Sequence, residues 1–269
     1  MENKKVIVIT GSSRGIGFGL TKSFLEHGCL VVVSGSSDES TTKAYEALLE
    51  RFKPDQLYSF PCNVQDAQQI QSLWDAAISH FGRVDIWINN AGLSGPVQPI
   101  WSQTPEIAGT VINTNLTGLI IATIIALKGM LKQGFGAIYN MEGMGSDGRI
   151  IPGMTIYGTT KHGEKYFNEA LWKEVENKEI IIGALRPGMV ATDLILDQYR
   201  GKPDEWKKVK GIFNIISDRV ENVAPWLAEK ILSNHKNGVR FNYLPFWKVL
   251  LRMITIPFSG RDVFQDFKL

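Results

Sequence analysis

Tyr157 and Lys161 are the two side chains in this sequence whose types and spacing best suit proton transfer. They stand four residues apart in a stretch typical of a helix, Tyr157–Glu176, and therefore share one helix face. A tyrosine with its reference pKa of about 10 is a poor base at neutral pH, but a nearby ammonium group favours the phenolate. The pair predicts a tyrosine that exchanges a proton with a reacting oxygen beside a lysine.

A glycine-rich turn follows the first apolar run, Val6–Thr10, and precedes an expected helix, Ile16–His27. Gly11 permits a tight turn, Gly15 lets the backbone approach a pyrophosphate, and Gly17 lets the helix pack close to the strand. The N–H groups and the dipole of the helix N-terminus would face the phosphates. This context predicts a dinucleotide-binding site, for which the turn offers the further candidates Ser13, Arg14 and Ile16.

The residues after the second expected strand, Leu30–Ser34, bear on the choice between NAD and NADP. Gly35 stands where an acid would bind the ribose 2′-hydroxyl. Ser36 and Ser37 could instead bond to a 2′-phosphate, and Arg14 would add a cation. Asp38 could turn in as a substitute acid. The sequence favours NADP(H) over NAD(H).

Short β-branched runs alternate with longer helical stretches along the whole chain, which predicts one doubly wound domain over residues 1–269. We expect seven parallel strands, right-handed crossovers and helices on both faces. Besides the two strands above, the expected strands are Leu57–Cys62, Asp85–Asn89, Ala137–Met141, Ile180–Leu185 and Val239–Leu244. The other expected helices are Ser40–Phe52 (capped by Ser40), Asp66–His80, Pro105–Leu131 and Glu221–Ser233.

Composition excludes several classes of protein. The 269 residues are 44% hydrophobic, and 29 basic against 27 acidic residues leave a net charge of +2. A disordered chain and a nucleic-acid-binding protein are therefore not expected. Cys29 and Cys62 form no cluster, so we expect neither a metal site nor a disulfide scaffold. Residues 1–5 run directly into the first strand without a signal-peptide pattern, and we expect a cytoplasmic protein.

The order of these motifs resembles the short-chain dehydrogenase/reductase family. The resemblance rests on the glycine turn, Asn89-Asn90-Ala91-Gly92, Asn115, the Tyr157/Lys161 motif, and Pro187-Gly188 followed by Thr192. It implies that Asn90, Ala91 and Gly92 lie beside the adenine ribose, that Asn63 and Val64 touch adenine, and that Pro187, Gly188, Val190 and Thr192 hold the nicotinamide carboxamide. The family has an aspartate at the position of Asn63.

The resemblance also implies catalytic roles. Tyr157 would protonate the nascent alkoxide, Lys161 would grip the nicotinamide ribose, and Asn115 would interrupt its helix and hold a relay water. The family's serine position is occupied by Gly143 or Met144. Either the loop carries Ser146 into place, or serine polarisation of the carbonyl is lost. Glu142 would order this loop or contact the substrate.

The loop 140–146 and the segment Phe241–Pro245 narrow the resemblance to the chlorophyll b reductase branch. We therefore expect NADPH-dependent reduction of a small hydrophobic carbonyl compound, with a chlorophyll b-type formyl group as one candidate. Another aldehyde, ketone or alcohol is the alternative substrate, and a non-catalytic NADP(H)-binding regulator is the alternative class.

Two segments lie outside these motifs. Residues 193–220 stand where the family places a substrate lid, although two ordinary amphipathic helices fit equally well. The apolar tail, 245–269, carries Lys248 and Arg252 on one face. It could cover the substrate pocket, dock on a second subunit or lie on a membrane surface. Excess apolar surface on Pro105–Leu131 and Tyr157–Glu176, including Leu119, Ile120, Ile124 and Phe167, predicts a homodimer or homotetramer.

Overall fold

Seven parallel strands form the central sheet of the computed structural model, which describes residues 4–259 and 261–267. Their order is β3-β2-β1-β4-β5-β6-β9, which reverses direction at β1 and β4. This is the doubly wound dinucleotide-binding arrangement, and it confirms the predicted fold class. The strands are β1 Val6–Ile9, β2 Leu30–Val33, β3 Leu57–Ser59, β4 Ile86–Asn89, β5 Gly136–Met141, β6 Ile180–Arg186 and β9 Val239–Asn242.

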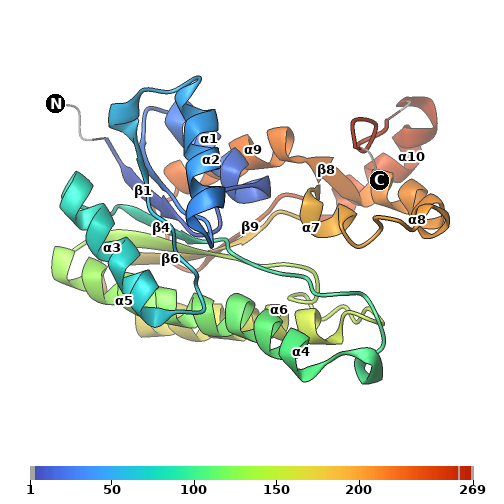
Figure 1. Ribbon diagram of the computed structural model, residues 1–269, viewed down its shortest axis with the longest axis horizontal. Helices are drawn as coiled ribbons and strands as arrows, with labels where there is room; N and C mark the ends of the chain where they lie inside the picture. The colour runs from blue at the N-terminus through green and yellow to red at the C-terminus, as the bar shows by residue number, and fades with distance from the viewer. Residues whose placement is uncertain (1–3, 260, 268–269) are drawn as a thin grey trace.

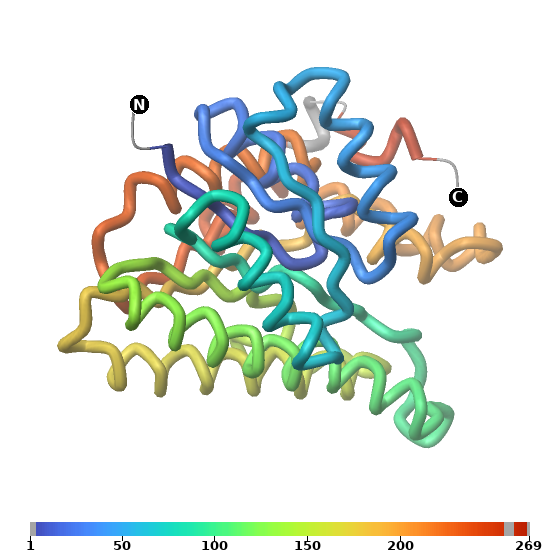
Figure 2. The backbone as a smooth tube through the Cα atoms, turned by 60° about the vertical axis from the view of Figure 1, so that its left-hand side comes forward, coloured from blue at the N-terminus to red at the C-terminus, as the bar shows by residue number. Residues whose placement is uncertain are grey.

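Helices cover both faces of the sheet, as Figures 1 and 2 show. One core packs Ile7, Ile9, Val31 and Val33 against α1, α2 and α9. Val8, Val32 and Trp87 point the other way, into the core under α3, α5 and α6. The six helices are α1 Gly15–Glu26, α2 Asp38–Leu49, α3 Ala67–Phe81, α5 Gly118–Gln133, α6 Thr155–Glu174 and α9 Val220–Leu232.

Two predicted helices differ from the structure. Helix α2 begins at Asp38, because Ser37 and not Ser40 is its N-cap: Ser37 Oγ accepts a hydrogen bond from the Ser40 amide at 3.2 Å. The single predicted helix Pro105–Leu131 is α4 (Pro105–Ile112), a π-helical turn (Asn113–Thr117) and α5. Residues 105–133 have the length and composition of a membrane span, although they supply Ala122, Ala126 and Met130 to the core.

Residues 189–219, 246–259 and 261–267 form what we call the C-terminal lobe, at one end of the sheet (Figure 1). Strand β7 (Met189–Ala191) pairs with β8 (Ser217–Arg219), and between them lie α7 (Asp193–Leu196) and α8 (Pro203–Ile216). Helix α10 (Phe246–Ser259) contacts α8. Neither β7 nor β8 was predicted, because three residues give no periodicity. Residues 1–3, Gly260 and 268–269, which the predicted domain and tail include, lie outside the described residues. Short 3-10 turns occur at Pro54–Gln56 and Ile100–Ser102.

Candidate active site

The glycine turn between β1 and α1 leaves no room for side chains. Gly11 and Gly15 have φ of 63° and 58°, a conformation that favours glycine. A Cβ on Gly11 would lie 2.8 Å from the Ala91 Cα, and one on Gly17 would lie 2.5 Å from both Asn90 Nδ2 and the Gly11 carbonyl oxygen. The turn therefore brings the N-terminus of α1 against the end of β4, as a dinucleotide site requires.

Asn90 fastens this turn to the neighbouring strand. Its Nδ2 donates hydrogen bonds to the carbonyl oxygens of Thr10 (2.9 Å) and Gly11 (2.8 Å). Gly92, two residues later, keeps an open space: a Cβ there would lie 3.5 Å from Asn115 Oδ1 and 4.0 Å from Lys161 Nζ. The segment 90–92 thus lies between the glycine turn and Lys161 of α6.

The segment 187–192 lies opposite the glycine turn. A Cβ on Gly15 would be 3.5 Å from Thr192 Cγ2. Pro187 and Val190 are buried, and Gly188 has a φ of 76°. The residues proposed for the two ends of a dinucleotide therefore border the same side of the sheet, and the space left by Gly92 lies between them. These residues fit a nicotinamide dinucleotide.

The residues proposed for the 2′-phosphate and for adenine have further contacts. Ser36, Ser37 and Arg14 are exposed, and the Ser37 hydroxyl caps α2. Gly35 lies against the turn, since a Cβ there would be 3.0 Å from Ser13 Cβ. Asp38, the first residue of α2, is also exposed.

Strand β3 ends at Ser59, three residues earlier than predicted, so Asn63 and Val64 follow it after a short loop. The side-chain oxygen of Asn63 accepts a hydrogen bond from the Gln65 amide at 3.1 Å, and Val64 is buried in the core. Asn63 therefore shapes the turn before α3, in addition to any contact with adenine.

Helix α6 presents Tyr157 and Lys161 to the loop after β5. A Cβ on Gly143 would lie 2.3 Å from the Tyr157 hydroxyl and 3.2 Å from Lys161 Cε, so a larger residue there would displace the Tyr157 hydroxyl. Lys161 Nζ donates to the Met141 carbonyl at 3.0 Å. Burial raises the pKa of Tyr157; the Lys161 charge opposes this rise, whereas Glu164 adds to it.

Glu164 is the polar residue of the site that sequence reasoning missed. It lies one turn after Lys161, is fully buried, and accepts a hydrogen bond from Lys161 Nζ at 2.7 Å. Burial lowers the pKa of Lys161, but the charges of Glu164 and Tyr157 outweigh burial and raise it. The available signal was a carboxylate three residues after the lysine, on the face expected to pack inward.

Asn115 occupies the middle of the π-helical turn and is completely buried. Its side chain accepts a hydrogen bond from the Leu93 amide (2.7 Å) and donates to the Leu93 carbonyl (2.8 Å) and to Thr160 Oγ1 (3.2 Å). The predicted interruption of the helix is present, and Asn115 joins it to the segment after Gly92. A π turn of this kind is frequent at functional sites.

Ser146 and Glu142 have opposite hydrogen-bonding states in the same loop. Ser146 Oγ is buried with no hydrogen-bond partner among the described residues. Glu142 is buried as well, but it pairs with Arg186 (2.8 Å) and with Arg240 (3.0 Å). Glu142 therefore orders the loop, one of the two roles predicted for it, and Ser146 keeps an uncommitted hydroxyl.

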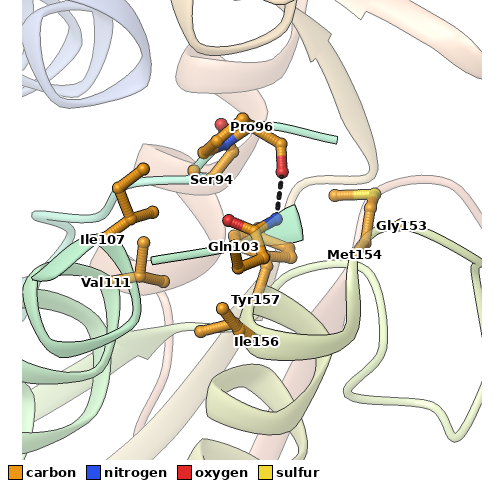
Figure 3. A pocket seen from close by; sticks show the side chains of 10 residues that line it. Ser94, Pro96, Gln103, Ile107, Val111, Gly153, Met154, Ile156 and Tyr157 are labelled. Carbon is orange, nitrogen blue, oxygen red and sulfur yellow. Dashed lines mark hydrogen bonds between the residues drawn. The ribbon is translucent and has the colours of Figure 1, made fainter. Parts of the chain in front are cut away.

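A small pocket opens beside Tyr157 (Figure 3). Ile107, Val111, Met154 and Ile156 give it apolar walls, and Ser94 and Gln103 give it polar ones. Gln198, after α7, donates a hydrogen bond to Ser94 Oγ at 3.0 Å, so the C-terminal lobe touches the rim of the pocket. No described tail residue lines the pocket, and among the described residues no three potential metal ligands gather.

Known proteins share this arrangement. Residues 5–202 match the family described as short chain dehydrogenase. A probable chlorophyll(ide) b reductase of Arabidopsis thaliana, described as chloroplastic, is 32% identical over 265 residues, covering 93% of this chain and 52% of the relative. A chloroplastic chlorophyll(ide) b reductase of Oryza sativa subsp. japonica is 34% identical over 230 residues, covering 84% of this chain and 66% of the relative. The chain belongs to the short-chain dehydrogenase family.

The predicted resemblance to chlorophyll b reductases is thereby confirmed, although the chain spans only about half to two thirds of the length of these curated relatives. Among solved structures, an actinorhodin polyketide ketoreductase variant with NADPH has a TM-score of 0.80 and 25% identity, covering 90% of this chain and 97% of that one. A levodione reductase has a TM-score of 0.81 at 24% identity, covering 89% and 95%, which shows the common fold.

Proposed function

We propose that this chain is an NADPH-dependent reductase of a hydrophobic carbonyl compound, with the formyl group of a chlorophyll b-type molecule as the leading candidate. The observation that carries the proposal is that Tyr157 lines a pocket with apolar sides and lies next to Lys161. Relatives named chlorophyll(ide) b reductases support the choice of substrate.

The nicotinamide, when bound, supplies the hydride that reaches the carbonyl carbon. The Tyr157 hydroxyl donates its proton to the carbonyl oxygen, so that the C=O bond becomes an alcohol and Tyr157 becomes a phenolate. Lys161 stabilises that phenolate by its charge, and Asn115 holds the turn through which a proton returns. Ser146 is the candidate donor to the developing oxyanion.

NADP(H) is the proposed cofactor because the end of β2 presents no acid within the strand, and Gly35, Ser36 and Ser37 follow it. Exposed Arg14 adds a cation at the N-terminus of α1. Solved relatives include one with NADPH and another with NADH, so family membership alone leaves the choice open.

The lid is the next part of the proposal. Residues 193–220 lie largely between β7 and β8, and Gln198 contacts the pocket rim at Ser94. We propose that this segment is a lid that closes over the bound substrate.

Helices α4, α5 and α6 supply the proposed subunit contact, for which Ile112, Ile124, Leu131 and Tyr166 are exposed. Leu119, one of the residues predicted for this contact, is instead buried within the chain. A homodimer or homotetramer is the proposed assembly. A cytoplasmic location stays a prediction, since the plant relatives are described as chloroplastic.

Helix α10 is assigned to an anionic lipid surface. Apart from Thr255, its exposed side chains among the described residues are apolar, and exposed Lys207 and Lys208 lie on the neighbouring helix α8. Apolar side chains inserted at the headgroup boundary, with cations close by, favour such a surface.

NADPH oxidation with a carbonyl panel that includes chlorophyllide b tests the function. We expect turnover with chlorophyllide b and identification of its hydroxymethyl product by mass. Turnover with other carbonyl compounds but not with chlorophyllide b would support the proposed reductase activity and contradict the proposed substrate. NADPH binding without any turnover would support the non-catalytic regulator, which the glycine in place of the family's serine segment favours.

A further inference from the structure

Glu164 is a buried carboxyl group that the reaction above does not use. Its Oε1 accepts the hydrogen bond from Lys161 Nζ at 2.7 Å, and both side chains are buried. Its Oε2 is also buried, with no hydrogen-bond partner among the described residues. A carboxylate that is buried with one oxygen unsatisfied is costly, so a charge at this position calls for a physical explanation.

Glu142, the neighbouring buried carboxylate, shows what a purely structural role looks like. Two arginines bind it, Arg186 from β6 and Arg240 from β9, and Asn168 adds a hydrogen bond at 3.4 Å. Among the described residues, Glu164 pairs with one cation, Lys161. Burial raises the pKa of Glu164 to about 7, although the Lys161 charge opposes this rise.

We propose that Glu164 is a positioning residue that acts through Lys161: by neutralising the ammonium group it keeps the Tyr157 hydroxyl protonated, and so preserves the proton donor for carbonyl reduction at higher pH. The inference rests on the proposed function. An unopposed ammonium beside a phenol favours the phenolate, and a carboxylate on that ammonium weakens this effect. Lys161 Nζ lies 5.8 Å from the centre of the Tyr157 ring, within reach of such an interaction.

Few other charges face this pair among the described residues. Tyr157 and Lys161 come from α6 itself, and Glu142 comes from the end of β5. Arg186 and Arg240 neutralise Glu142, and Arg240 also pairs with Glu169 on α6. The π-helical turn contributes the uncharged Asn115. Glu164 is thus the carboxylate that forms an ion pair with Lys161.

The test is a titration of Tyr157 by phenolate absorbance, taken as the difference between each protein and its Tyr157→Phe counterpart. Glu164→Gln should lower the Tyr157 midpoint by about one pH unit, because the amide keeps the shape and removes the charge. Glu164→Met, a second neutral variant, should lower it as well if the glutamine variant does not fold. Glu164→Asp keeps the charge and should stay near the wild-type midpoint.

Glu169→Gln is the matched control, since Glu169 is a half-exposed residue of the same helix that pairs with Arg240 and not with Lys161. It should leave the midpoint unchanged. An unchanged or raised midpoint in both neutral Glu164 variants would overturn the proposal. The basic limb of kcat/KM for carbonyl reduction should move with the midpoint. A protein that reduces no carbonyl would contradict the proposed function, while the titration still tests Glu164.

Discussion

Helices α6 and α10 both turn charged side chains inward, but these side chains differ in how many hydrogen-bond partners they have. On α10, Arg252 pairs with Asp218, which also accepts hydrogen bonds from Tyr243 (2.9 Å) and Asn222 (2.8 Å). On α6, Lys161 and Glu164 share one hydrogen bond, and Glu164 Oε2 has no partner among the described residues. Saturated charges hold a structure together, whereas undersaturated ones remain available for chemistry.

The outer faces of the two helices complete the contrast. Helix α10 exposes Phe246 (78%), Trp247 (65%), Leu250, Leu251, Met253 and Ile254. Lys248, on its inner side, lies 3.7 Å from the centre of the Tyr243 ring. This helix therefore has its polar side inside and its apolar side outside, the reverse of the usual amphipathic pattern. Such a helix calls for a partner surface along its whole outer face.

Removing the proton donor of α6 should have the largest effect. Tyr157→Phe keeps the ring packing and loses the hydroxyl, so carbonyl reduction should fall by roughly 10²–10⁴-fold. NADPH binding, measured by fluorescence titration, should stay within about twofold. Unchanged turnover on a confirmed substrate would show that Tyr157 is not the proton donor.

Breaking the Asp218 cluster under α10, in which Asp218 binds Arg252, Tyr243 and Asn222, should cost stability and spare chemistry. Asp218→Ala leaves Arg252 buried without its carboxylate, and we expect a loss of about 3 kcal/mol in the free energy of unfolding. Asp266→Ala, which removes the exposed partner of Arg219 in the same lobe, should cost less than about 1 kcal/mol. Urea denaturation measures both, and equal losses would remove the distinction between the helices.

The same cluster predicts a pH dependence. Burial raises the pKa of Asp218, but hydrogen bonds from Asn222, Tyr243 and the Arg219 amide, with the Arg252 charge, outweigh burial and lower it. A depressed folded pKa gives stability that is full above the ordinary aspartate value of about 4 and is lost as the pH falls through the folded value. Wild type should therefore lose more stability than Asp218→Ala below about pH 4.

Ser146→Ala probes the uncommitted hydroxyl next to α6. If Ser146 donates to the developing oxyanion, reduction should slow by about a hundredfold while NADPH binding is retained. Steady-state kinetics on the confirmed substrate provide the measurement. A loss below about threefold would assign carbonyl polarisation to backbone N–H groups or water around Gly143.

Sequence patterns revealed the nucleotide half of the molecule because packing there follows local rules. The β-branched runs predicted all seven central strands. A Cβ would clash at Gly11 and Gly17, and Gly15 has a positive φ that favours glycine. The position of Asn115 in an interrupted helix also came from the motif order. The strands follow from residues close to each other in the chain, whereas Asn115 was placed by the family resemblance and bonds to residues far away in the chain.

Long-range contacts decided what the sequence could not reveal. Strands β7 and β8 exist because residues 189–191 and 217–219 pair with each other across an intervening segment of 25 residues, 192–216. The inward direction of Arg252 depends on Asp218, far away in the chain, so a helical wheel alone gives no inside or outside. In the sequence, Glu164 is indistinguishable from the other polar residues of an amphipathic helix, and only the fold shows its burial against Lys161.

Cofactor preference gives a smaller effect, near the N-terminus. Because β2 ends without an acid, NADPH should bind at least about tenfold tighter than NADH, as measured by fluorescence titration of both. Equal affinities would contradict this. If Asp38 turns toward the ribose, Asp38→Ala should improve NADPH binding further.

The apolar face of α10 gives the smallest effect and tests the second half of the comparison. On vesicles of phosphatidylglycerol and phosphatidylcholine, Trp247→Ala should weaken binding by about fivefold, since part of an indole ring leaves the lipid boundary. Ile150→Ala, a control at a highly exposed residue of the loop after β5, should bind as wild type does. Raising the salt concentration should weaken the binding of all three proteins to vesicles, because salt screens the attraction of Lys207 and Lys208 to the anionic headgroups. If wild type ignores vesicles and Trp247→Ala instead dissociates an oligomer in sedimentation velocity, a second copy covers α10, and the lipid assignment is wrong.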